Sequence, residues 1–494
     1  MRMTSETRTP PHILAAIEGG ACQFIDLQFT DVTGALKSVV LPSRQLAKTL
    51  EHGHWFDGSA LEGEARAMET DLLLRPDLST WGILPWLGPG GQRTGRLVCD
   101  IQTPDETPFP ADPRAVLARA IREATGLGYE YRTGAEVEFF LFHRKPEQRN
   151  TRTGPHRAAG TFSAAGMSSN TDPMGAPADR GGYFDLSPES DAHFRDEVVQ
   201  ALAALSIQVE ASHHEIGPGQ HEIDLPLLPA MRAADAITTC KYVVKTVARR
   251  RGLAATFMPK PIAGVAGSGL HLAQVLLSLD GHNAFAEPLD EHGLSPTGRA
   301  FIAGQLAHAR AMCAVLAPSV NSYKRLGRGF DAPSSLTWGH TNPLAAIRVP
   351  RPQLRRLHRL PSTRSTSTLT TLSDGSMQSA SGAVHVELRC PDPSCNPYLA
   401  LTAALAAGLD GIRNNLEPPA PSDGIAASLI DESQLEVLPA SLGEALQELE
   451  WDPVIRDALG APVFERLLLA REQEWQAYRR QVSAWELNRY FEGA

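Results

Sequence analysis

Apolar and polar side chains alternate at a spacing of two residues in several short segments of the chain. The first such segment is Phe24-Ile25-Asp26-Leu27-Gln28-Phe29. Alternation of this kind predicts a half-buried β-strand, so we expect a small β-rich domain to begin here. Residues 1–12 show no such pattern, and we expect them to form a loose tail.

A helix is predicted directly after a segment rich in proline and acidic residues at 102–113. Asp112 can cap this helix, and Pro113 suits its first position because proline has no N–H group to leave unpaired. The apolar residues that follow lie along one helical face: Leu117, Ala120, Ile121 and Ala124. We therefore place a domain boundary near residue 109, between a domain at 13–109 and a larger one at 110–494.

The larger domain has an α+β pattern, because short strand patterns bounded by glycine and proline alternate with amphipathic helices. Two stretches interrupt the pattern and predict long loops. Residues 145–181 are rich in glycine, proline and serine, and residues 351–382 pass from an arginine-rich run into serine and threonine. Beyond residue 441 we expect helices, because Ser441 with Glu444 and Ser483 with Glu486 have the capping-box spacing.

Composition excludes several classes of protein. With 494 residues, 42% apolar residues and 21% charged residues, the chain is typical of globular proteins. A net charge of −10 does not suit nucleic acid as the main partner, and no run of about 18 apolar residues predicts a membrane span. The six cysteines have no paired spacing, and the N-terminus has no apolar leader, so we expect a cytoplasmic protein.

Pairs of carboxylates mark the candidate chemistry. In the strand pattern at 135–141, Glu136 and Glu138 share one face and the apolar residues share the other. Further on, a tight turn at Pro218-Gly219 would place Glu215 and Glu222 directly opposite one another in a hairpin. Like charges in that position repel unless a cation lies between them, so a divalent cation is expected.

A third strand pattern at 384–389 places His385, Glu387 and Arg389 on one face, and Gly267-Ser268-Gly269-Leu270-His271 adds backbone amides and an imidazole. Each motif alone also fits an ordinary structural role, such as a solvated strand face or a buried ion pair. Together they offer five carboxylates and one imidazole. Donors that are mostly oxygen atoms suit Mg²⁺ or Mn²⁺ better than zinc.

Taken in order, these motifs resemble the glutamine synthetase family. The matching segments run from about Phe24 to the C-terminus: Phe56-Asp57-Gly58-Ser59, Glu136-Val137-Glu138-Phe139, Gly182-Tyr183-Phe184-Asp185, Glu215 to Glu222, Gly267 to His271, Asn321-Ser322-Tyr323-Lys324-Arg325-Leu326, Glu387-Leu388-Arg389 and Asn396-Pro397-Tyr398. The resemblance implies a small β-grasp-like N-terminal domain and a catalytic domain with an antiparallel sheet flanked by helices. It also implies an ATP-dependent ligase that joins ammonia to glutamate through a γ-glutamyl phosphate.

The resemblance assigns roles to individual residues. It implies that Glu138, Glu215 and Glu222 hold one metal ion and that Glu136, His271 and Glu387 hold a second. Substrate would be bound by Tyr183, Gly267, Arg325 and Arg389, and the nucleotide by Glu210 and Arg348. Asp57, Asp331 and Arg348 would take part in catalysis. Because the family contributes Asp57 from the neighbouring subunit, a homo-oligomer of two hexameric rings, a dodecamer, is expected.

The sequence departs from the family pattern mainly where phosphate is bound. Proline stands at position 343, where the family has a phosphate-binding arginine, and His385 replaces another. The substitutions Ala266, Ala273 and Asp331 change further substrate and nucleotide contacts. The arginines at 351–382 either replace these contacts or form a solvated basic loop. Besides glutamine synthetase itself, two alternatives stay open: a γ-glutamylamide ligase that uses an organic amine, and a weakened or regulatory homologue.

Overall fold

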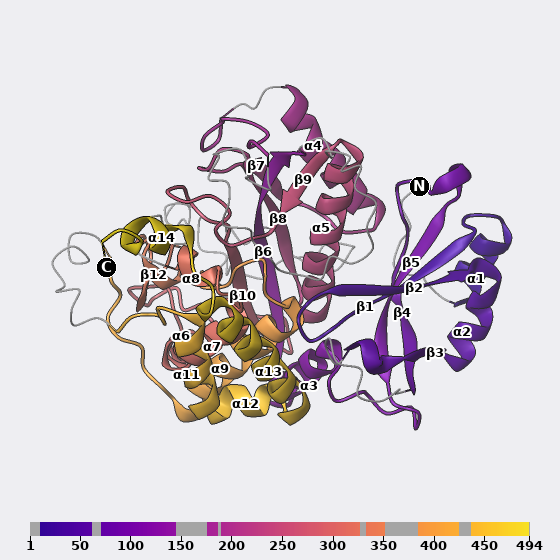
Figure 1. Cartoon of the computed structure of the whole chain (residues 1–494). Helices are drawn as coiled ribbons and strands as arrows, with labels where there is room; N and C mark the ends of the chain where they lie inside the picture. The colour runs from indigo at the N-terminus through magenta and orange to yellow at the C-terminus, as the bar shows by residue number, and fades with distance from the viewer. Residues whose placement is uncertain are drawn as a thin grey trace, which may run out of the picture.

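The structure is a computed structural model of the whole chain (Figure 1). It describes residues 10–61, 71–144, 175–185, 189–326, 332–350, 384–423 and 436–493. The site prediction for Asp331, the loop prediction for 351–382 and most of the loop prediction for 145–181 lie outside these residues. Helix α1 begins at Pro10, so residues 10–12 belong to this helix and the prediction of a loose tail there was wrong.

The N-terminal part of the chain forms a five-stranded sheet in the order β2-β1-β5-β4-β3, in which β1 and β5 are parallel and the other pairs are antiparallel. Its elements are α1 (Pro10–Glu18), β1 (Phe24–Thr30), β2 (Leu36–Pro42), α2 (Leu46–His52), β3 (His54–Asp57), β4 (Asp71–Ile83) and β5 (Thr94–Gln102).

Strand β1 is buried on both faces, not half-buried as its alternation predicts. The apolar side chains of Ile25 and Leu27 fill the core of the N-terminal sheet, while Asp26 and Gln28 are also buried, at 8% and 2% exposed. Next to β1 on β5, Arg96 donates a hydrogen bond to Thr239 of helix α5 (Ala230–Arg250), so the polar face of this part of the sheet meets the second half of the chain.

The second sheet has eight strands in the order β11-β12-β13-β10-β6-β8-β7, with β9 paired to β6. All pairs are antiparallel except β11 with β12. Its strands are β6 (Tyr129–His143), β7 (Ala211–His214), β8 (Gln220–Pro229), β9 (Leu253–Thr256), β10 (Leu270–Ser278), β11 (Ser335–Gly339), β12 (Ala345–Arg348) and β13 (Val386–Leu388).

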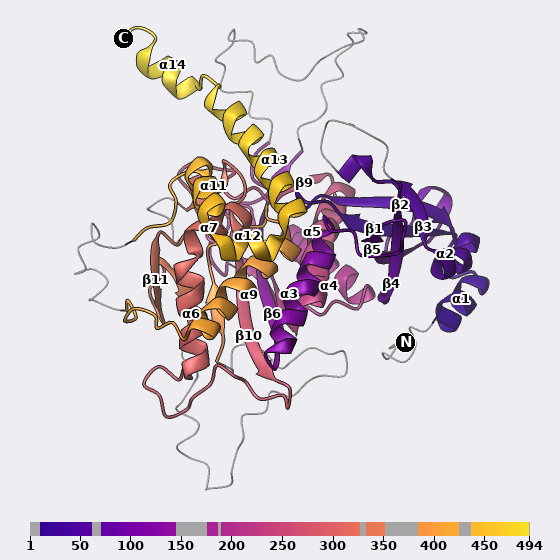
Figure 2. The same cartoon turned by 90° about the horizontal axis from the view of Figure 1, so that it is seen from below.

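Helices flank this sheet and complete an α+β fold, as expected. Helix α5 packs against β6 and β8, and helices from several parts of the chain pack against α9, among them α3, α6, α7 and α12 (Figures 1 and 2). The remaining helices are α3 (Pro113–Gly126), α4 (Glu189–Ala204), α6 (Pro296–Ala307), α7 (Ala309–Leu316), α8 (Ser322–Arg325), α9 (Pro397–Asn414), α11 (Leu442–Trp451), α12 (Pro453–Leu459), α13 (Ala461–Arg479) and α14 (Ala484–Tyr490).

The predicted helix caps are largely confirmed. The Asp112 side chain accepts a hydrogen bond from the Arg114 N–H, and Pro113 occupies the first helical position of α3. Ser483 and Glu486 form a complete capping box at α14. At α11 only half of the box forms, because Glu444 accepts from the Ala440 N–H and not from that of Ser441.

Candidate functional site

The candidate site lies on the central strands of the second sheet, where strand register aligns the acidic side chains. Glu138 on β6 pairs with Glu222 on β8, and Glu136 pairs with Asp224 two residues along. On the other side of β6, His271 of β10 pairs with Glu136. Successive residues on the same face of a strand are two apart, so these side chains project from one face of the sheet.

One predicted metal group converges closely. The His271 Nδ1–H donates to Glu136 Oε2 at 2.7 Å, and His271 Nδ1 lies 3.8 Å from Glu387 Oε1. One ligand atom from each of these three side chains lies within 4.8 Å of the others. Glu387 is 3% exposed, and its Oε1 is buried without a hydrogen-bond partner, which is costly unless a cation or donor completes it.

The second predicted group, Glu138, Glu215 and Glu222, is buried at 7%, 8% and 6% exposed. Glu215 and Glu222 are not directly opposite, so that expectation was wrong. The Glu215 N–H donates to the Gln220 carbonyl, which makes a four-residue loop at 216–219 and shifts the pairing by two residues. A shift of two keeps both glutamates on the same face, so the prediction of proximity survives the error in register.

A histidine fills the position expected for a carboxylate in this hairpin. His213 is the direct partner of Glu222, and its Nε2 lies 3.0 Å from Glu215 Oε1 and 3.6 Å from Glu222 Oε1. His213, Glu222 and Asp224 together form another group that could hold a metal ion. Sequence reasoning missed His213 and Asp224, although both follow from the two-residue spacing around Glu215 and Glu222.

Burial and mutual repulsion dominate the electrostatics of the clustered carboxylates. Burial and then the charges of Glu138, Glu136 and Asp224 raise the pKa of Glu222 to about 12. Burial and Glu215 also raise the pKa of Glu138. Burial opposes the charge of Glu136 too, but the hydrogen bond and charge of His271, together with the charges of Arg348 and Arg389, outweigh burial and lower the pKa of that carboxylate. A divalent cation would let all of these groups ionise.

Arginines border the acidic cluster. Arg348 of β12 is opposite Glu387, and its Nη1 donates to Glu387 Oε2 at 3.2 Å. Arg389 lies next to the same carboxylate, with Nε 3.3 Å from Glu387 Oε1, while its Nη1 donates to the Pro343 carbonyl at 2.6 Å. Arg348 and Arg389 are therefore positioned at the mouth of the cluster.

Arg325 has a different setting from the one expected of a substrate clamp. It is 4% exposed, and its guanidinium donates three hydrogen bonds to the carbonyls of Arg389, Cys390 and Pro391. These bonds fix the end of β13 beside the cluster. A guanidinium has five N–H donors, so this arrangement leaves others for a bound carboxylate.

The glycine-rich turn before β10 has no room for side chains at Gly267 and Gly269. A Cβ at Gly267 would lie 2.3 Å from the Pro259 carbonyl oxygen. A Cβ at Gly269 would lie 2.6 Å from Arg325 Nη2, 3.0 Å from His271 Nε2 and 3.1 Å from Glu138 Oε1. Any larger residue at position 269 would therefore intrude among the metal-ligand candidates.

Three predicted site residues lie at or beyond the margin of the cluster. Tyr183 is 54% exposed and stacks edge-on to His213, and burial together with Glu215 and Glu222 raises the pKa of its hydroxyl. Glu210 is exposed at the start of β7, and burial and Asp224 raise its pKa. Asp57, at the end of β3, lies in the N-terminal sheet, apart from β6, β8 and β10 within one chain (Figures 1 and 2).

Asp179 is a further residue that sequence reasoning missed. Its Oδ1 accepts hydrogen bonds from His214 Nε2 at 2.7 Å and from the N–H groups of Gly181 and Gly219. His214 in turn contacts the Glu215 carbonyl through Nδ1 at 2.6 Å. Asp179 thus ties the segment that carries Tyr183 to the turn that carries Glu215. Residues 145–181 had been assigned to one long loop, so nothing in the sequence drew attention to a single aspartate there.

The residues present fit a divalent metal. The donor set consists of carboxylate oxygens with one or two imidazoles. Two of these oxygens, Glu387 Oε1 and Asp224 Oδ1, are buried without a hydrogen bond, and glycine at position 269 keeps the space between the ligands open. The fold and site therefore define an α+β protein with a candidate divalent-cation centre on one face of a mostly antiparallel sheet.

Comparison with known proteins identifies the family. The family model of the glutamine synthetase catalytic domain matches residues 110–370 and 375–490, and that of the glutamine synthetase β-grasp domain matches residues 21–104. The chain belongs to the glutamine synthetase family, which confirms the resemblance read from the motifs. The family is enzymatic, consists of carbon–nitrogen ligases, and typically binds ATP and divalent metals.

Relatives of similar length support this assignment. The chain is 43% identical to the glutamine synthetase of Thermus thermophilus, with 98% of each protein covered, and 40% identical to that of Thermotoga maritima, with 99% of each covered. A solved structure described as a GmaS/ADP complex is 28% identical, covers 97% of this chain and 99% of its own, and has a TM-score of 0.76. No helix in the described part of the chain has the length and apolar composition that crossing a bilayer requires.

Proposed function

We propose that this protein forms an amide bond between ammonia and the side-chain carboxylate of glutamate. ATP transfers its terminal phosphoryl group to that carboxylate, which gives γ-glutamyl phosphate and ADP. The nitrogen of ammonia then attacks the acyl carbon, and inorganic phosphate leaves. The acidic cluster on β6, β8, β10 and β13 is the observation that carries this proposal, because phosphoryl transfer depends on neutralising phosphate charge.

Two metal ions, Mg²⁺ or Mn²⁺, would be held by the two groups of ligands. Glu136, His271 and Glu387 suit one ion. We assign Glu138, Glu215 and Glu222 to the other from the family resemblance, and His213 and Asp224, which converge with Glu222, lie beside them. The metals would supply positive charge for the phosphoryl oxygens. The protein itself supplies the strand register that keeps the ligands on one face.

Cationic side chains complete the proposed substrate site. Arg348 and Arg389 lie beside Glu387 and would hold the phosphoryl group and a glutamate carboxylate. Arg325 fixes the end of β13 through its hydrogen bond to the Arg389 carbonyl. Gly267 would offer backbone contacts. We assign Glu210 to the nucleotide and Asp331 to closure over the intermediate, both from the family resemblance.

Tyr183 and Glu215 are proposed to receive ammonium together with Asp57. Asp57 is exposed in the N-terminal sheet and lies apart from the cluster of its own chain, so a neighbouring subunit would have to supply it. Helix α14 supports assembly independently, since Trp485, Tyr490 and Phe491 are 65%, 52% and 83% exposed on a segment that extends away from the body (Figure 2). We therefore propose a homo-oligomer, a dodecamer of two hexameric rings.

The proposed function is tested by giving purified protein ATP, Mg²⁺, glutamate and ammonium. Phosphate release and amide formation are measured together. Equal amounts of phosphate and glutamine support the proposal. Phosphate without amide, or neither product, contradicts it.

A γ-glutamylamide ligase that uses an organic amine is the second candidate. It is favoured by the similarity to the two GmaS structures, each covering 97% of this chain. The same assay with methylamine and ethylamine in place of ammonium separates the two candidates. A larger kcat/KM for an amine than for ammonium would assign the second function.

A weakened enzyme is the third candidate, and Pro343 is the reason to consider it. The residue is exposed at the mouth of the site, where its carbonyl accepts a hydrogen bond from Arg389, and proline provides no positive charge for a phosphate. Loss of one preorganised donor typically lowers turnover by about 10²–10³. Pro343→Arg should therefore raise turnover, whereas an already fast wild-type enzyme that Pro343→Arg does not improve would contradict the weakened site.

Mixing two inactive variants and measuring the activity of the mixed oligomers tests whether each site is shared between two subunits. Asp57→Ala subunits and Glu387→Gln subunits should each be inactive alone, because each lacks one half of every site. If Asp57 comes from the neighbouring subunit, mixed oligomers contain some complete sites and regain activity. A particle near the mass of one chain in light scattering, or no regained activity, would contradict the shared site.

A further inference from the structure

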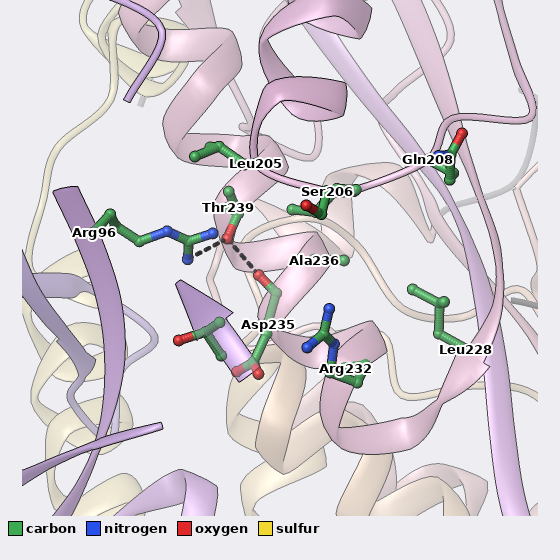
Figure 3. A pocket seen from close by; sticks show the side chains of 11 residues that line it. Arg96, Leu205, Ser206, Gln208, Leu228, Arg232, Asp235, Ala236 and Thr239 are labelled. Atoms are coloured by element: carbon green, nitrogen blue, oxygen red, sulfur yellow. Dashed lines mark hydrogen bonds between the residues drawn. The ribbon is translucent and has the colours of Figure 1, made fainter. Parts of the chain in front are cut away.

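A hollow lies between the N-terminal sheet and the catalytic domain, and none of its lining residues belongs to the acidic cluster. It opens between β5, the segment after α4 and the first turns of α5 (Figure 3). The empty space there amounts to about 470 Å³, part of it open to solvent. Its lining is Thr80, Arg96, Leu205, Ser206, Ile207, Gln208, Leu228, Arg232, Asp235, Ala236 and Thr239.

Arg96 is the unusual residue of this hollow. It is 3% exposed, yet the hydrogen bond that its guanidinium makes is to a neutral hydroxyl, from Nη1 to Thr239 Oγ1 at 3.1 Å. Its Nε is buried without a partner. Within the described residues, no carboxylate lies at ion-pair distance from Arg96. Buried arginines are ordinarily paired, because an unpaired charge loses its hydration without compensation.

A second guanidinium faces the same space. Arg232, in the first turn of α5, points into the hollow from the side opposite Arg96, and its Nη1 donates to the Ser79 carbonyl at 2.7 Å (Figure 3). Burial lowers the pKa of Arg96, Asp235 and Tyr398 oppose this effect, and the charge of Arg232 adds to it. Two cations therefore share one hollow.

The nearby carboxylates do not pair with the guanidinium group of Arg96. Asp235 is bound on both oxygens by Arg114 and also accepts from the Tyr398 hydroxyl. Asp26, the register partner of Arg96 on β1, accepts a hydrogen bond from Gln28 and influences Arg96 only at longer range. Neither aspartate satisfies the remaining donors of Arg96, so these donors are left for something that enters the hollow.

We propose that this hollow binds a small oxyanion, a phosphate or carboxylate group, held between Arg96 and Arg232. Planar guanidinium groups recognise both kinds of anion by paired hydrogen bonds. The Thr80 hydroxyl in the same lining is already engaged, because it donates to the Asp77 carbonyl and accepts from the Val98 N–H, so the two guanidinium groups carry the site. Helix α5 begins at Ala230 without a side-chain cap, and the first turn of a helix has positive potential.

The site would lie at the junction of the two domains. Arg96 belongs to the N-terminal sheet and Arg232 to the catalytic domain, so an anion held by both would bridge β5 and α5. The proposal is independent of the ligase reaction, since none of these residues belongs to the acidic cluster.

The test measures binding of inorganic phosphate and, separately, of succinate to the full-length protein by isothermal titration calorimetry, at constant ionic strength held with KCl. We expect saturable binding with a millimolar or lower Kd. Arg96→Gln should weaken this binding about tenfold or more, because at least one charge-assisted hydrogen bond is lost. Binding of phosphate alone or of succinate alone identifies the type of oxyanion.

Control variants separate this site from the ligase site. Arg122→Gln, at an exposed position on α3, should leave the binding unchanged. Any part of the phosphate or succinate binding that is lost in Arg348→Gln belongs to the ligase site and is subtracted. Arg232→Gln replaces a partly exposed residue and keeps the test valid if Arg96→Gln does not fold. No saturable binding by the wild-type protein, or equal affinity in the wild type and both hollow variants, would overturn the proposal, and water alone would then satisfy Arg96.

Discussion

Two regions of buried charge in this protein differ in whether a shared cation pairs directly with the carboxylates. At the domain junction, Arg114 is 5% exposed and forms ion pairs with Asp77, Asp100 and Asp235. On the sheet face, buried glutamates crowd together with too few cations, so the pKa of Glu222 rises to about 12. Both regions are polar, buried and built on neighbouring secondary-structure elements.

The difference indicates which region serves stability and which serves binding. A network in which one guanidinium pairs directly with every carboxylate is costly to break, because removal of that partner strands the others. An unbalanced cluster is costly in the empty protein and gains stability when a counter-ion binds. We therefore expect substitutions in the first region to change folding and substitutions in the second to change ligand affinity.

The largest effect is expected for Arg114→Gln. The change leaves Asp235 buried without its bidentate partner, so the free energy of unfolding should fall by about 3–5 kcal/mol. Urea unfolding measures this loss. Arg122→Gln, at an exposed position on the same helix, is the matched control and should be nearly silent. A loss below about 1 kcal/mol for Arg114→Gln would remove the contrast between the two regions.

Glu387→Gln should lower activity and leave stability almost unchanged, the reverse of what is expected for Arg114→Gln. The substitution keeps the size of the side chain but removes the carboxylate next to His271, Arg348 and Arg389, so turnover should fall by about 10²–10³. The metal-free protein should unfold at the same or a slightly higher urea concentration, since one crowded acidic group is gone. Marked destabilisation with activity retained would assign Glu387 to the fold.

A smaller effect is expected for Asp179→Asn, which weakens the support of the Glu215 turn. Residues that orient metal ligands typically contribute roughly 10–100-fold to metal affinity or activity. We expect a loss in this range in Mn²⁺ affinity, with KM for ATP unchanged. Asp196→Asn on α4, where the side chain is 67% exposed, is the control. Equal effects of the two substitutions would show that Asp179 does not position the turn.

The smallest expected effect is on the pH dependence of stability, and it arises at His308, outside the acidic cluster. Burial opposes the charge of His308, but Asp452 and Asp410 outweigh burial and raise its pKa. A raised pKa in the folded state stabilises the protein below the ordinary pKa of histidine, and this contribution is lost as pH rises through the folded pKa. The loss should be at most about 1 kcal/mol and should be absent in His308→Gln. Urea midpoints between pH 6 and 9 test this, and parallel curves for both proteins would contradict it.

The fold and the kinds of residue at the site could be predicted because they depend on local patterns. Alternation places Glu136 and Glu138 on one face whatever the tertiary structure, and the Asp112-Pro113 cap requires only neighbouring residues. The register of the hairpin that carries Glu215 and Glu222 was harder to predict. Its loop could contain two or four residues, and the sequence does not decide between them.

Partnerships between distant residues could not be predicted at all. Asp179 meets His214 and Gly219 only after two segments pack together, and Arg96 meets Thr239 across a separation of 143 residues. Nor does the alternation at Phe24–Thr30 reveal that the polar face of the strand would be covered by another domain. Burial of a polar residue depends on tertiary contacts, and the sequence pattern alone gives no sign of them.

Binding of Mn²⁺, followed by electron paramagnetic resonance on the metal-free protein, tests the contrast between the two regions most directly. The wild-type protein should bind Mn²⁺ at the acidic cluster, Glu387→Gln should bind it at least tenfold more weakly, and Arg122→Gln should bind it as the wild type does. Wild-type protein that binds no Mn²⁺, or that binds it equally well after Glu387→Gln, would contradict the assignment of the unbalanced carboxylates to a metal centre.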